Sequence, residues 1–413
     1  MSYYGIFLLT CTLSLIIVNT VHASFMVSSV VEEVKDNPDI YLKTPELIRK
    51  YGYPVEIHDV ITADGYILTL HRIPHGRKKH VGSDQNRISR PPVFMQHGLL
   101  SSSACWILAS PENGPAYIMA DAGYDVWLGN ARGNLYSRNH TRFDPNASHF
   151  WQFSWDEMAE YDIPAVIDYV LATTGYSQLY YIGHSMGTTM FFAGMSARPE
   201  YNKKVKAMFG LGPVATTAHI LSPIKYLAPF SKDINIILKL LGKYEFLPSN
   251  PEYIKWTEVI CTHYKFEKLM CRNALFFLTG FDAHEFNMTW LPVILGHGAE
   301  GTSSKTVVHF AQEVNSGKFQ RYDYGYYGNM KIYHQHTPPP YNLSQVTVPV
   351  ALLWANNDWL ADPKDVAGLA AGLPNLVINL KMPLPDFNHI DFVWGIDCKK
   401  LVYDKILKYM PYF

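Results

Sequence analysis

The most constraining feature of the sequence is an apolar run that leads directly into a Gly-x-Ser-x-Gly motif. Residues Leu179–Gly183 predict a buried strand, and the residues from Met186 onward predict a helix. A strand-to-helix turn this tight accepts only glycine at its flanks, here Gly183 and Gly187, and it exposes the Ser185 hydroxyl at the positive end of the helix. The motif therefore predicts that Ser185 is a nucleophile; an ordinary turn is the alternative.

Short apolar runs that alternate with helical patterns predict an α/β fold with a mostly parallel central sheet and helices on both faces. Ahead of them, Thr44 is expected to cap a short helix, and Val55–Val60 and Tyr66–Arg72 are expected to form a hairpin. The parallel strands are expected at Pro92–Gln96, Asp125–Leu128, Leu179–Gly183, Val205–Leu211, Val350–Trp354 and Leu376–Leu380. A later helix is expected to begin with a capping box at Ser154 and Glu157 and to end before Gly175.

The alternation stops between about Ala215 and Gln345, where helical patches replace the strand–helix repeat. We interpret this interval as an inserted, largely helical cap, within which Tyr322–Tyr327 is expected to be an irregular connection. The predicted organisation is a signal peptide at 1–23, a first core segment at 24–215, the cap at 216–345 and a second core segment at 346–413.

A serine nucleophile needs a base, and in hydrolases with this strand–turn–helix the chain order is serine, then acid, then histidine. His389 is the histidine that follows the last acid-bearing turn, so we expect it to be the base. Asp358, the first carboxylate after the strand at Val350, is the preferred acid. Asp362 is the rival, but it precedes Pro363 and is typical of a helix N-cap.

A tetrahedral intermediate needs two main-chain N–H donors for its oxyanion. Met186, directly after the nucleophile, is expected to supply one. The loop Gln96–Leu100 follows an early strand, and Gly98 allows it to turn its amides inward, so Leu99 is expected to supply the other. His97 precedes the acid in the chain and is expected to pack or support rather than react.

Composition limits the classes of partner. The chain of 413 residues has 35 Lys and Arg against 36 Asp and Glu, and its basic runs are too short to follow a phosphate backbone. We therefore expect no nucleic-acid partner, and nothing indicates an obligate protein partner. Aromatic residues make up 14% of the chain, which supplies apolar surface for a core or an apolar ligand.

The N-terminus has the pattern of an export signal. The apolar run from Ile6 to Val18 is short for a membrane span, and Val21-His22-Ala23 follows with the spacing of a cleavage site. No Lys or Arg precedes the run, so an uncleaved anchor is the alternative. Four glycosylation sequons agree with export to the exterior or to lysosomes, at Asn139, Asn146, Asn287 and Asn342.

Four cysteines follow the predicted signal. Cys261 and Cys271 are within reach of a loop-closing disulfide, whereas Cys105 and Cys398 have no neighbour that suggests a partner. The sequence gives little support for a catalytic thiol. It gives little support for zinc held by Cys261, His263 and Cys271 as well, because their spacing matches no zinc-finger or zinc-ribbon pattern.

Eight segments, in order along the chain, resemble the acid lipase family of lysosomal and gastric lipases. They are Tyr51–Pro54, Thr62–Leu68, Leu70–Pro74, Gln96–Leu100, Gly123–Asn130, Gly183–Thr189, Leu360–Pro363 and Asn388–Phe392. The resemblance implies an α/β-hydrolase fold with a cap and lid, hydrolysis of triacylglycerols or sterol esters, often at acid pH, and no metal or organic cofactor.

The resemblance also assigns residues. It carries the nucleophile to Ser185, the acid to Asp358, the base to His389 and the oxyanion donors to Leu99 and Met186, and these assignments agree with the ones reached from the motifs.

The cap disulfide of the family maps to Cys261 and Cys271, which are one residue further apart here. The other departure is Met186, where vertebrate members typically have Gln. Because a main-chain amide is the donor, we expect that side chain to alter the pocket and not the chemistry.

The sequence thus predicts a secreted or lysosomal serine hydrolase of neutral lipid esters that works at an oil–water or membrane interface. A carboxylesterase for small soluble esters is the first alternative, and the apolar, aromatic cap argues against it. A catalytically inactive lipid-binding protein is the second, and the complete Ser, Asp and His set argues against that.

Overall fold

A single large sheet forms the centre of the fold. The computed structural model describes residues 37–77, 90–231, 236, 242–249, 252, 265–298 and 300–413. Residues Asp39–Phe413 form one unit; the other unit, Met1–Pro38, lies almost wholly outside the described residues, and so does the predicted signal peptide.

The strands of the main sheet are β1 (Glu56–Ile61), β2 (Tyr66–Ile73), β3 (Pro92–Gln96), β4 (Asp125–Leu128), β5 (Asn139–His140), β6 (Leu179–His184), β7 (Val205–Leu211), β10 (Val350–Trp354) and β11 (Leu376–Lys381). Their order is β1-β2-β4-β3-β6-β7-β10-β11, with β5 paired to β2. In this order, every neighbouring pair from β4 through β11 is parallel. The pairs β1–β2, β2–β4 and β2–β5 are antiparallel. The predicted parallel sheet is confirmed, and each predicted strand is present within one residue.

Helices complete the described part of the unit. The α-helices are α2 (Thr44–Lys50), α3 (Pro115–Asp121), α4 (Trp155–Glu157), α5 (Ile163–Thr174), α6 (Met186–Ala197), α9 (Lys265–Thr279), α10 (Leu291–Gly296), α11 (Ser304–Ser316), α12 (Gly325–Tyr333), α13 (Pro363–Gly372), α14 (Asp391–Trp394) and α15 (Asp404–Tyr409). The 3₁₀ and π turns are η1 (Pro38–Ile40), η2 (Ser103–Trp106), η3 (Ser148–Trp151), η4 (Met158–Asp162), η5 (Pro199–Lys204), η6 (Pro223–Phe230), η7 (Leu343–Gln345), η8 (Lys399–Tyr403) and η9 (Met410–Tyr412).

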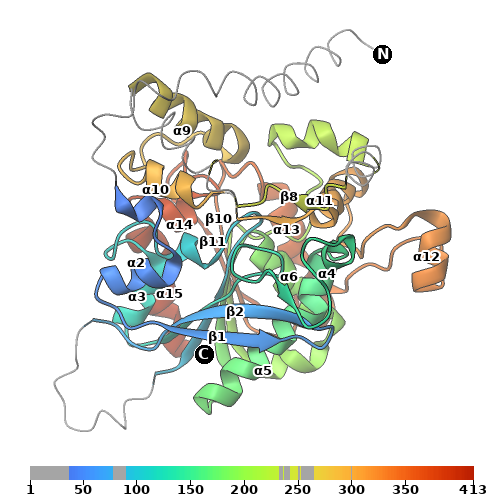
Figure 1. Cartoon of the computed structure of the whole chain (residues 1–413), viewed down its shortest axis with the longest axis horizontal. Helices are drawn as coiled ribbons and strands as arrows, with labels where there is room; N and C mark the ends of the chain where they lie inside the picture. Colours follow the sequence, from blue (N-terminus) through green and yellow to red (C-terminus); the bar gives the residue numbers. More distant parts are fainter. Residues whose placement is uncertain are drawn as a thin grey trace. The chain divides into compact units, whose positions relative to one another are not determined.

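The sheet is buried on both faces, because successive residues of its central strands enter two different cores. In β6, Tyr180 and Ile182 pack in one core, whereas Leu179 and Tyr181 pack in the other. Helices α2, α3, α14 and α15 contribute to the first core, and α5, α6 and α13 contribute to the second (Figure 1). This two-sided burial explains why the strands appear in the sequence as continuous apolar runs.

Three local predictions are confirmed. The hairpin of β1 and β2 pairs Ile61 with Ile67 around the predicted turn. Ser154 caps α4, and Glu157 Oε2 accepts the Ser154 N–H at 2.6 Å, which completes the capping box. Helix α5 ends where Gly175 takes φ +74°.

Two local predictions are wrong by small amounts. Thr44 is the first residue of α2 and not its cap; Lys43 precedes the helix, and its N–H donates to Glu46 Oε2 at 2.7 Å. The stretch Tyr322–Tyr327 is not wholly irregular, because α12 begins inside it at Gly325. The low hydrophobic periodicity of a helix that is exposed nearly all round accounts for this second error.

The segment between β7 and β10 lies in the same unit as the sheet. It contains η6, α9 to α12 and η7, and also a small antiparallel pair, β8 (Glu245–Phe246) with β9 (Thr302–Ser303). The residue limits of the cap stay a prediction. Among the described residues, no helix combines the length and apolar character that crossing a membrane requires.

Helix α11 packs on α4 through buried aromatic and acidic groups. The His309 ring stacks on Trp155 with centroids 3.8 Å apart. Glu313 is buried beside Asp156, and neither of its carboxylate oxygens has a hydrogen-bond partner in the described part of the chain. Burial, with the nearby carboxylates of Asp156 and Asp365 as smaller causes, raises the pKa of Glu313 well above its ordinary value.

Asp156 behaves in the same way. Its carboxylate accepts hydrogen bonds from Tyr341 Oη at 2.6 Å and from the Tyr322 N–H at 2.8 Å. Burial, with Glu157 as the next cause, nevertheless raises the pKa of Asp156 to about 7. The junction between α4 and α11 is therefore formed by acidic side chains that favour the protonated state.

We expect these buried carboxyl groups to contribute less to the stability of the fold as pH rises from about 5 to about 8. A carboxyl whose pKa is higher in the folded than in the unfolded chain binds more protons when folded, so its contribution falls with rising pH above the unfolded pKa. Glu313→Gln removes one such group, so relative to the parent protein the free energy of unfolding of the variant should increase between the two pH values, by an amount on the order of 1–3 kcal/mol. Urea unfolding followed by tryptophan fluorescence at both pH values measures this.

Glu112→Gln is the matched control, because the Glu112 side chain is 72% exposed. It should leave the pH dependence of the unfolding free energy as it is in the parent protein. The same pH dependence of the unfolding free energy in Glu313→Gln and in the parent protein would contradict the prediction.

Candidate functional site

Ser185 lies in the turn between β6 and α6, in a backbone conformation that residues with a side chain rarely adopt. Its φ is 53° and its ψ is −121°. Its N–H donates to the carbonyl of Leu211 at the end of β7 at 3.1 Å, and its carbonyl accepts the Thr188 N–H at 2.8 Å. The strand and the helix thus hold the strained residue from both sides.

Glycines around Ser185 are required by close packing. A Cβ on Gly187 would lie 2.3 Å from the carbonyl oxygen of Gln96, and a Cβ on Gly183 would lie 3.0 Å from the Gly187 carbonyl group. A Cβ on Gly98 would lie 3.0 Å from Ser185 Cβ. The loop after β3 can therefore approach Ser185 closely, because Gly98 and Gly187 have no side chains to fill the space between the loop and the turn.

Asp358 and His389 form a buried pair. Asp358 follows β10, and His389 lies two residues before α14. His389 Nδ1 is 2.8 Å from Asp358 Oδ2 and 2.9 Å from Oδ1. Asp358 Oδ1 also accepts the N–H groups of Leu360 and Ala361 at 2.9 and 2.7 Å, which fixes the carboxylate. Donation from Nδ1 to this carboxylate leaves Nε2 as the basic nitrogen.

No hydrogen bond from the described residues reaches that nitrogen. His389 Nε2 is buried and has no hydrogen-bond partner among the described residues, and the Ser185 hydroxyl is not bonded to it in this structure. A buried acceptor without a donor is costly to maintain in a folded protein. Such an atom is typical of a site that completes its hydrogen bonds when a ligand binds.

His184 supports His389 from the side of the strand. Its Nε2–H donates to the main-chain carbonyl of His389 at 2.9 Å, and the two ring centroids are 4.7 Å apart. Burial, with the His389 ring as a smaller cause, lowers the pKa of His184 to about 3. The ring is therefore neutral and acts as a hydrogen-bond donor that holds the position of the His389 main chain.

Two other residues shape the site and were missed in the sequence. Gly212 follows β7 with φ +52°, and a Cβ there would lie 2.9 Å from His389 Nδ1 and 3.0 Å from Asp358 Oδ2. Asn388 accepts the Ile390 N–H at 2.9 Å and donates to the Gly280 carbonyl at 2.9 Å. A glycine directly after a predicted strand was a usable signal for Gly212; no sequence signal indicates the partners of Asn388.

The two expected oxyanion donors flank the serine. Within the described residues, neither the Leu99 N–H nor the Met186 N–H donates to a protein acceptor. Leu100 takes φ +59°, so the loop bends sharply just after Leu99. Met186 is the first residue of α6, where the helix dipole adds positive potential. Neither group therefore has a protein acceptor that an anion would have to displace.

Asp362 and His97 have the structural roles that the sequence predicted for them. Asp362 caps α13, and its carboxylate accepts the Lys364 N–H at 2.8 Å. His97 is buried; its Nε2 accepts the Ala131 N–H at 3.0 Å, and burial lowers the pKa of the ring to about 4. Neither side chain contacts Ser185.

The cysteines divide into two classes. Cys271 is disulfide-bonded; its expected partner, Cys261, lies outside the described residues, as does His263. Cys105 and Cys398 are free, buried thiols, and burial raises the pKa of each. A thiol that resists ionisation is a poor nucleophile, which disfavours a catalytic cysteine at either position.

The sequon asparagines lie at or near the surface. Asn139, Asn146 and Asn342 are exposed, and Asn287 is half-buried. In Asn287 and Asn342 the amide oxygen accepts a hydrogen bond from the hydroxyl of the same sequon, Thr289 at 2.8 Å and Ser344 at 2.7 Å.

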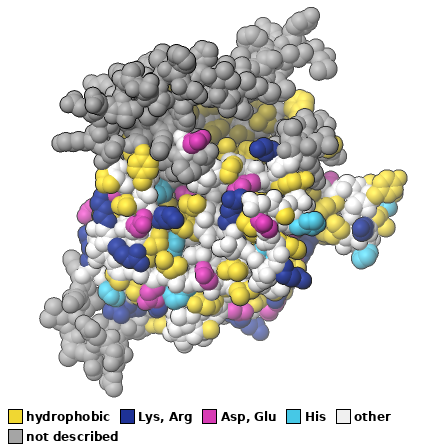
Figure 2. Space-filling view, viewed as in Figure 1, with side chains coloured by type: hydrophobic (Ala, Val, Ile, Leu, Met, Phe, Trp, Pro, Cys, Tyr) yellow, Lys and Arg dark blue, Asp and Glu magenta, His cyan; other side chains and the backbone are white. Residues whose placement is uncertain are grey.

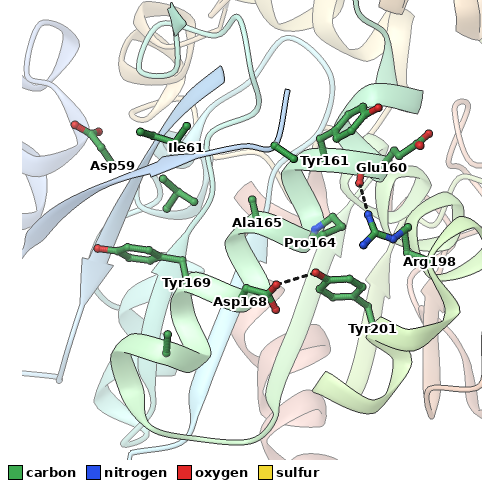
Figure 3. Close-up of a pocket in the computed structure, with 13 residues that line it drawn as sticks. Asp59, Ile61, Glu160, Tyr161, Pro164, Ala165, Asp168, Tyr169, Arg198 and Tyr201 are labelled. Atoms are coloured by element: carbon green, nitrogen blue, oxygen red, sulfur yellow. Dashed lines mark hydrogen bonds between the residues drawn. The ribbon is translucent and has the colours of Figure 1, made fainter. Parts of the chain in front are cut away.

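A cavity of about 660 Å³ lies elsewhere, between β1, η4 and α5 (Figure 3). Its charged groups already have partners: Asp168 accepts from Tyr201 Oη at 2.7 Å, as the figure shows, and Arg198 pairs with Glu200 at 2.7 Å. None of the residues around it belongs to the Ser185 cluster. We regard this cavity as part of the scaffold.

Comparisons with known proteins agree with the fold and the motifs. Residues 44–110 match the family described as the partial alpha/beta-hydrolase lipase region, and residues 91–241 match the alpha/beta hydrolase fold. Gastric triacylglycerol lipase of Bos taurus is 42% identical over 402 residues, which cover 96% of this chain and 98% of that protein. Lipase member K of Homo sapiens is 42% identical over 90% of this chain and 91% of that protein.

Solved structures support the fold alone. A lipase from Sulfolobus solfataricus superposes with a TM-score of 0.54 at 14% identity and covers 87% of this chain and 99% of that one.

A test of the His184 contact uses a fluorophosphonate probe that reacts with activated serines. His184→Phe removes the donor to the His389 carbonyl, and we expect labelling of Ser185 to slow on the order of 10- to 100-fold, as small misplacements of a base do. His184→Gln retains an N–H and should recover most of the rate. His149→Phe, at an exposed histidine, is the control and should label normally. Equal labelling of all three variants would exclude a positioning role.

Proposed function

The chain belongs to the family of gastric triacylglycerol lipases within the α/β-hydrolases, and on that basis we propose that it hydrolyses the esters of neutral lipids, triacylglycerols or sterol esters, with Ser185 as the nucleophile. The observation that carries the proposal is the buried Asp358–His389 pair, whose free Nε2 accompanies a serine held in a strained turn. A neutral lipid at an oil–water or membrane surface is the corresponding substrate.

In the proposed mechanism His389 Nε2 removes the proton of the Ser185 hydroxyl as Oγ attacks the ester carbonyl. Asp358 keeps Nδ1 protonated and stabilises the imidazolium, and the N–H groups of Leu99 and Met186 bind the oxyanion. His389 then protonates the departing alcohol. Water, deprotonated by the same nitrogen, releases the fatty acid from Ser185 and restores the hydroxyl.

Acidic working conditions fit the buried carboxyl groups. Burial raises the pKa of Asp156, Glu313 and Asp391, so all three favour a protonated state that a low pH supplies. His184 and His309 remain neutral because burial lowers the pKa of each. We therefore propose that the enzyme works at acid pH, with an exported, secreted or lysosomal location and glycans on the sequon asparagines.

The exposed apolar end of α9 favours a lipid substrate over a small soluble ester. Phe277, Leu278 and Phe281 are each about half-exposed. The Phe281 ring contacts Trp359, the residue after Asp358, with centroids 5.6 Å apart. Phe276 packs inside the protein, so of the two adjacent phenylalanines only Phe277 is available to an acyl chain. Residues 234–241 also have an apolar helical pattern in the sequence; of these the structure describes Ile236, which is exposed.

The two alternative functions make different predictions. A carboxylesterase for small esters would not need apolar surface beside the Asp358 loop, and a lipid-binding protein without turnover would not need the fixed Asp358–His389 geometry.

We propose that the disulfide of Cys271 with Cys261 secures the cap over this region. The limits 216–345 for that cap, and removal of residues 1–23 as a signal, belong to the same proposal.

Substitutions at the triad should behave as one unit. Ser185→Ala and His389→Ala should each lower turnover of any ester by about 10⁴ to 10⁶, and the double variant should be little worse than either single variant. Asp358→Asn should be severe, whereas Asp362→Asn should mainly lower stability, because it removes a negative charge from the N-terminus of α13. Steady-state kinetics with a soluble ester, with folding checked by circular dichroism, measures this; a reversed order for the two Asp variants would overturn the choice of acid.

Apolar surface beside the site should matter in proportion to chain length. Phe277→Ser combined with Leu278→Ser should lower hydrolysis of emulsified long-chain triacylglycerol several-fold more than hydrolysis of a short soluble ester, since each methylene left in water costs about 0.8 kcal/mol. Ile57→Ser with Ile61→Ser, exposed on β1, is the matched control and should affect neither substrate. Equal losses on both substrates would favour the carboxylesterase alternative.

A further inference from the structure

His97, in the loop after β3, is a buried polar group that the proposed mechanism does not use. On the face that Figure 2 shows, acidic and basic side chains of the described residues are interspersed, so no field of one sign marks a docking surface there. His97 is instead 1% exposed, and both of its ring nitrogens lie within hydrogen-bond distance of the main chain. These contacts lie beside the nucleophile, because the next residue, Gly98, packs on Ser185.

The partners of His97 determine which ring nitrogen carries the proton. The Ala131 main-chain nitrogen is 3.0 Å from Nε2. A main-chain N–H can only donate, so Nε2 is the acceptor and Nδ1 carries the hydrogen. Nδ1 is 2.7 Å from the Gly98 carbonyl oxygen and therefore donates to it. Burial lowers the pKa of the ring to about 4, so the neutral form that this arrangement requires predominates at pH 5 and above.

The hydrogen bond to the Gly98 carbonyl also orients the Leu99 N–H. Both groups belong to one peptide unit, and the described chain contains no cis peptide bond. In a planar trans peptide the C=O and the N–H point in opposite directions. The carbonyl is directed at the His97 ring, so the N–H is directed away from it. This N–H has no protein acceptor among the described residues.

This peptide needs an external contact because a glycine precedes it. Half a turn of the peptide plane changes ψ of Gly98 and φ of Leu99, and glycine permits a wide range of backbone angles. The turned plane would present the negative end of the Gly98 carbonyl where the Leu99 N–H now points. The far side of the bend is held separately, since Leu100 has φ +59° and its carbonyl accepts the Glu300 N–H at 3.3 Å.

The segment after β4 keeps the His97 ring in place. Asn134 Nδ2 is 3.3 Å from His97 Nε2 and 3.4 Å from the Ser101 carbonyl oxygen. Together with the Ala131 N–H, this amide directs two donors at Nε2. A ring that turned away would leave both donors without their acceptor in a buried region, which is costly. The Nδ1–H therefore stays against the Gly98 carbonyl.

We infer that His97 is a positioning residue for the oxyanion site. Its Nδ1–H holds the Gly98 carbonyl and so keeps the Leu99 N–H directed toward the oxyanion. The inference rests on the proposed function, because a tetrahedral oxyanion forms only if Ser185 attacks an ester. A donor of this kind binds charge that develops in the transition state, and losing one lowers kcat on the order of 10²- to 10³-fold.

Three substitutions separate this role from packing. His97→Leu removes both nitrogens, so kcat on a soluble short-chain ester should fall on the order of 10²- to 10³-fold with little change in KM. His97→Asn has an amide N–H at the position of Nδ1 along the side chain and should recover most of the loss. His97→Gln has its amide at the position of Nε2, where it reaches Ala131 and not Gly98, and should be as slow as His97→Leu.

His309→Leu is the matched control, because His309 is also 1% exposed and its Nε2 lies 3.0 Å from a main-chain carbonyl, that of Gln320. Its kcat should equal that of the parent protein once circular dichroism shows that each variant is folded.

A trifluoromethyl ketone gives a second readout, because Ser185 Oγ adds to its carbonyl carbon and the carbonyl oxygen becomes an oxyanion. Its affinity should fall in each His97 variant by the same factor as kcat/KM. Equal kcat in His97→Asn and His97→Gln, or ketone affinity unchanged from the parent protein, overturns the inference. Absence of ester turnover in the parent protein overturns the proposed function, and the inference with it.

Discussion

The rest of the site depends on the strained backbone at Ser185. A residue with φ 53° stays in that conformation only when its surroundings fix it, and here β7 and the first turn of α6 do so through main-chain hydrogen bonds. The same constraint requires Gly187, since any larger residue would collide with the Gln96 carbonyl. The loop that brings Leu99 to the serine is therefore placed by the packing that creates the strain.

Burial sets the protonation state of most titratable groups near the site. His184 is kept neutral and serves as a donor to His389, whereas Asp391, at the start of α14, has a raised pKa because of burial and the nearby Asp282 and Glu285. His184 and Asp391 therefore favour their uncharged forms beside the Asp358–His389 pair. The electrostatics of the pair are then governed by the fixed carboxylate and the two main-chain donors that it accepts from.

The sequence predicted the parallel sheet, the strand-to-helix turn at Ser185 and the pairing of Asp358 with His389, because these depend on local pattern and chain order. It did not predict His184 or Asn388 as supports, since their partners are His389 and Gly280, distant in sequence and brought close only by folding. Phe276 and Phe277 were indistinguishable in the sequence, yet one is buried and the other exposed. Helix α12 was missed because a helix that is exposed nearly all round has little apolar periodicity to detect.

Main-chain hydrogen bonds link the segment between β7 and β10 to the loops that carry Asp358 and His389. Trp359 receives hydrogen bonds from Leu221 and Ser222 at its carbonyl and donates its N–H to Thr279, whose carbonyl also accepts the His389 N–H. Gly280, with φ +112°, leaves no space for a side chain against Asn357. Exchange of this segment between relatives is consequently not a modular operation. A transplanted segment must reproduce the backbone path at 221–222 and 279–280, or it will displace Asp358 and His389 while both residues remain in the sequence.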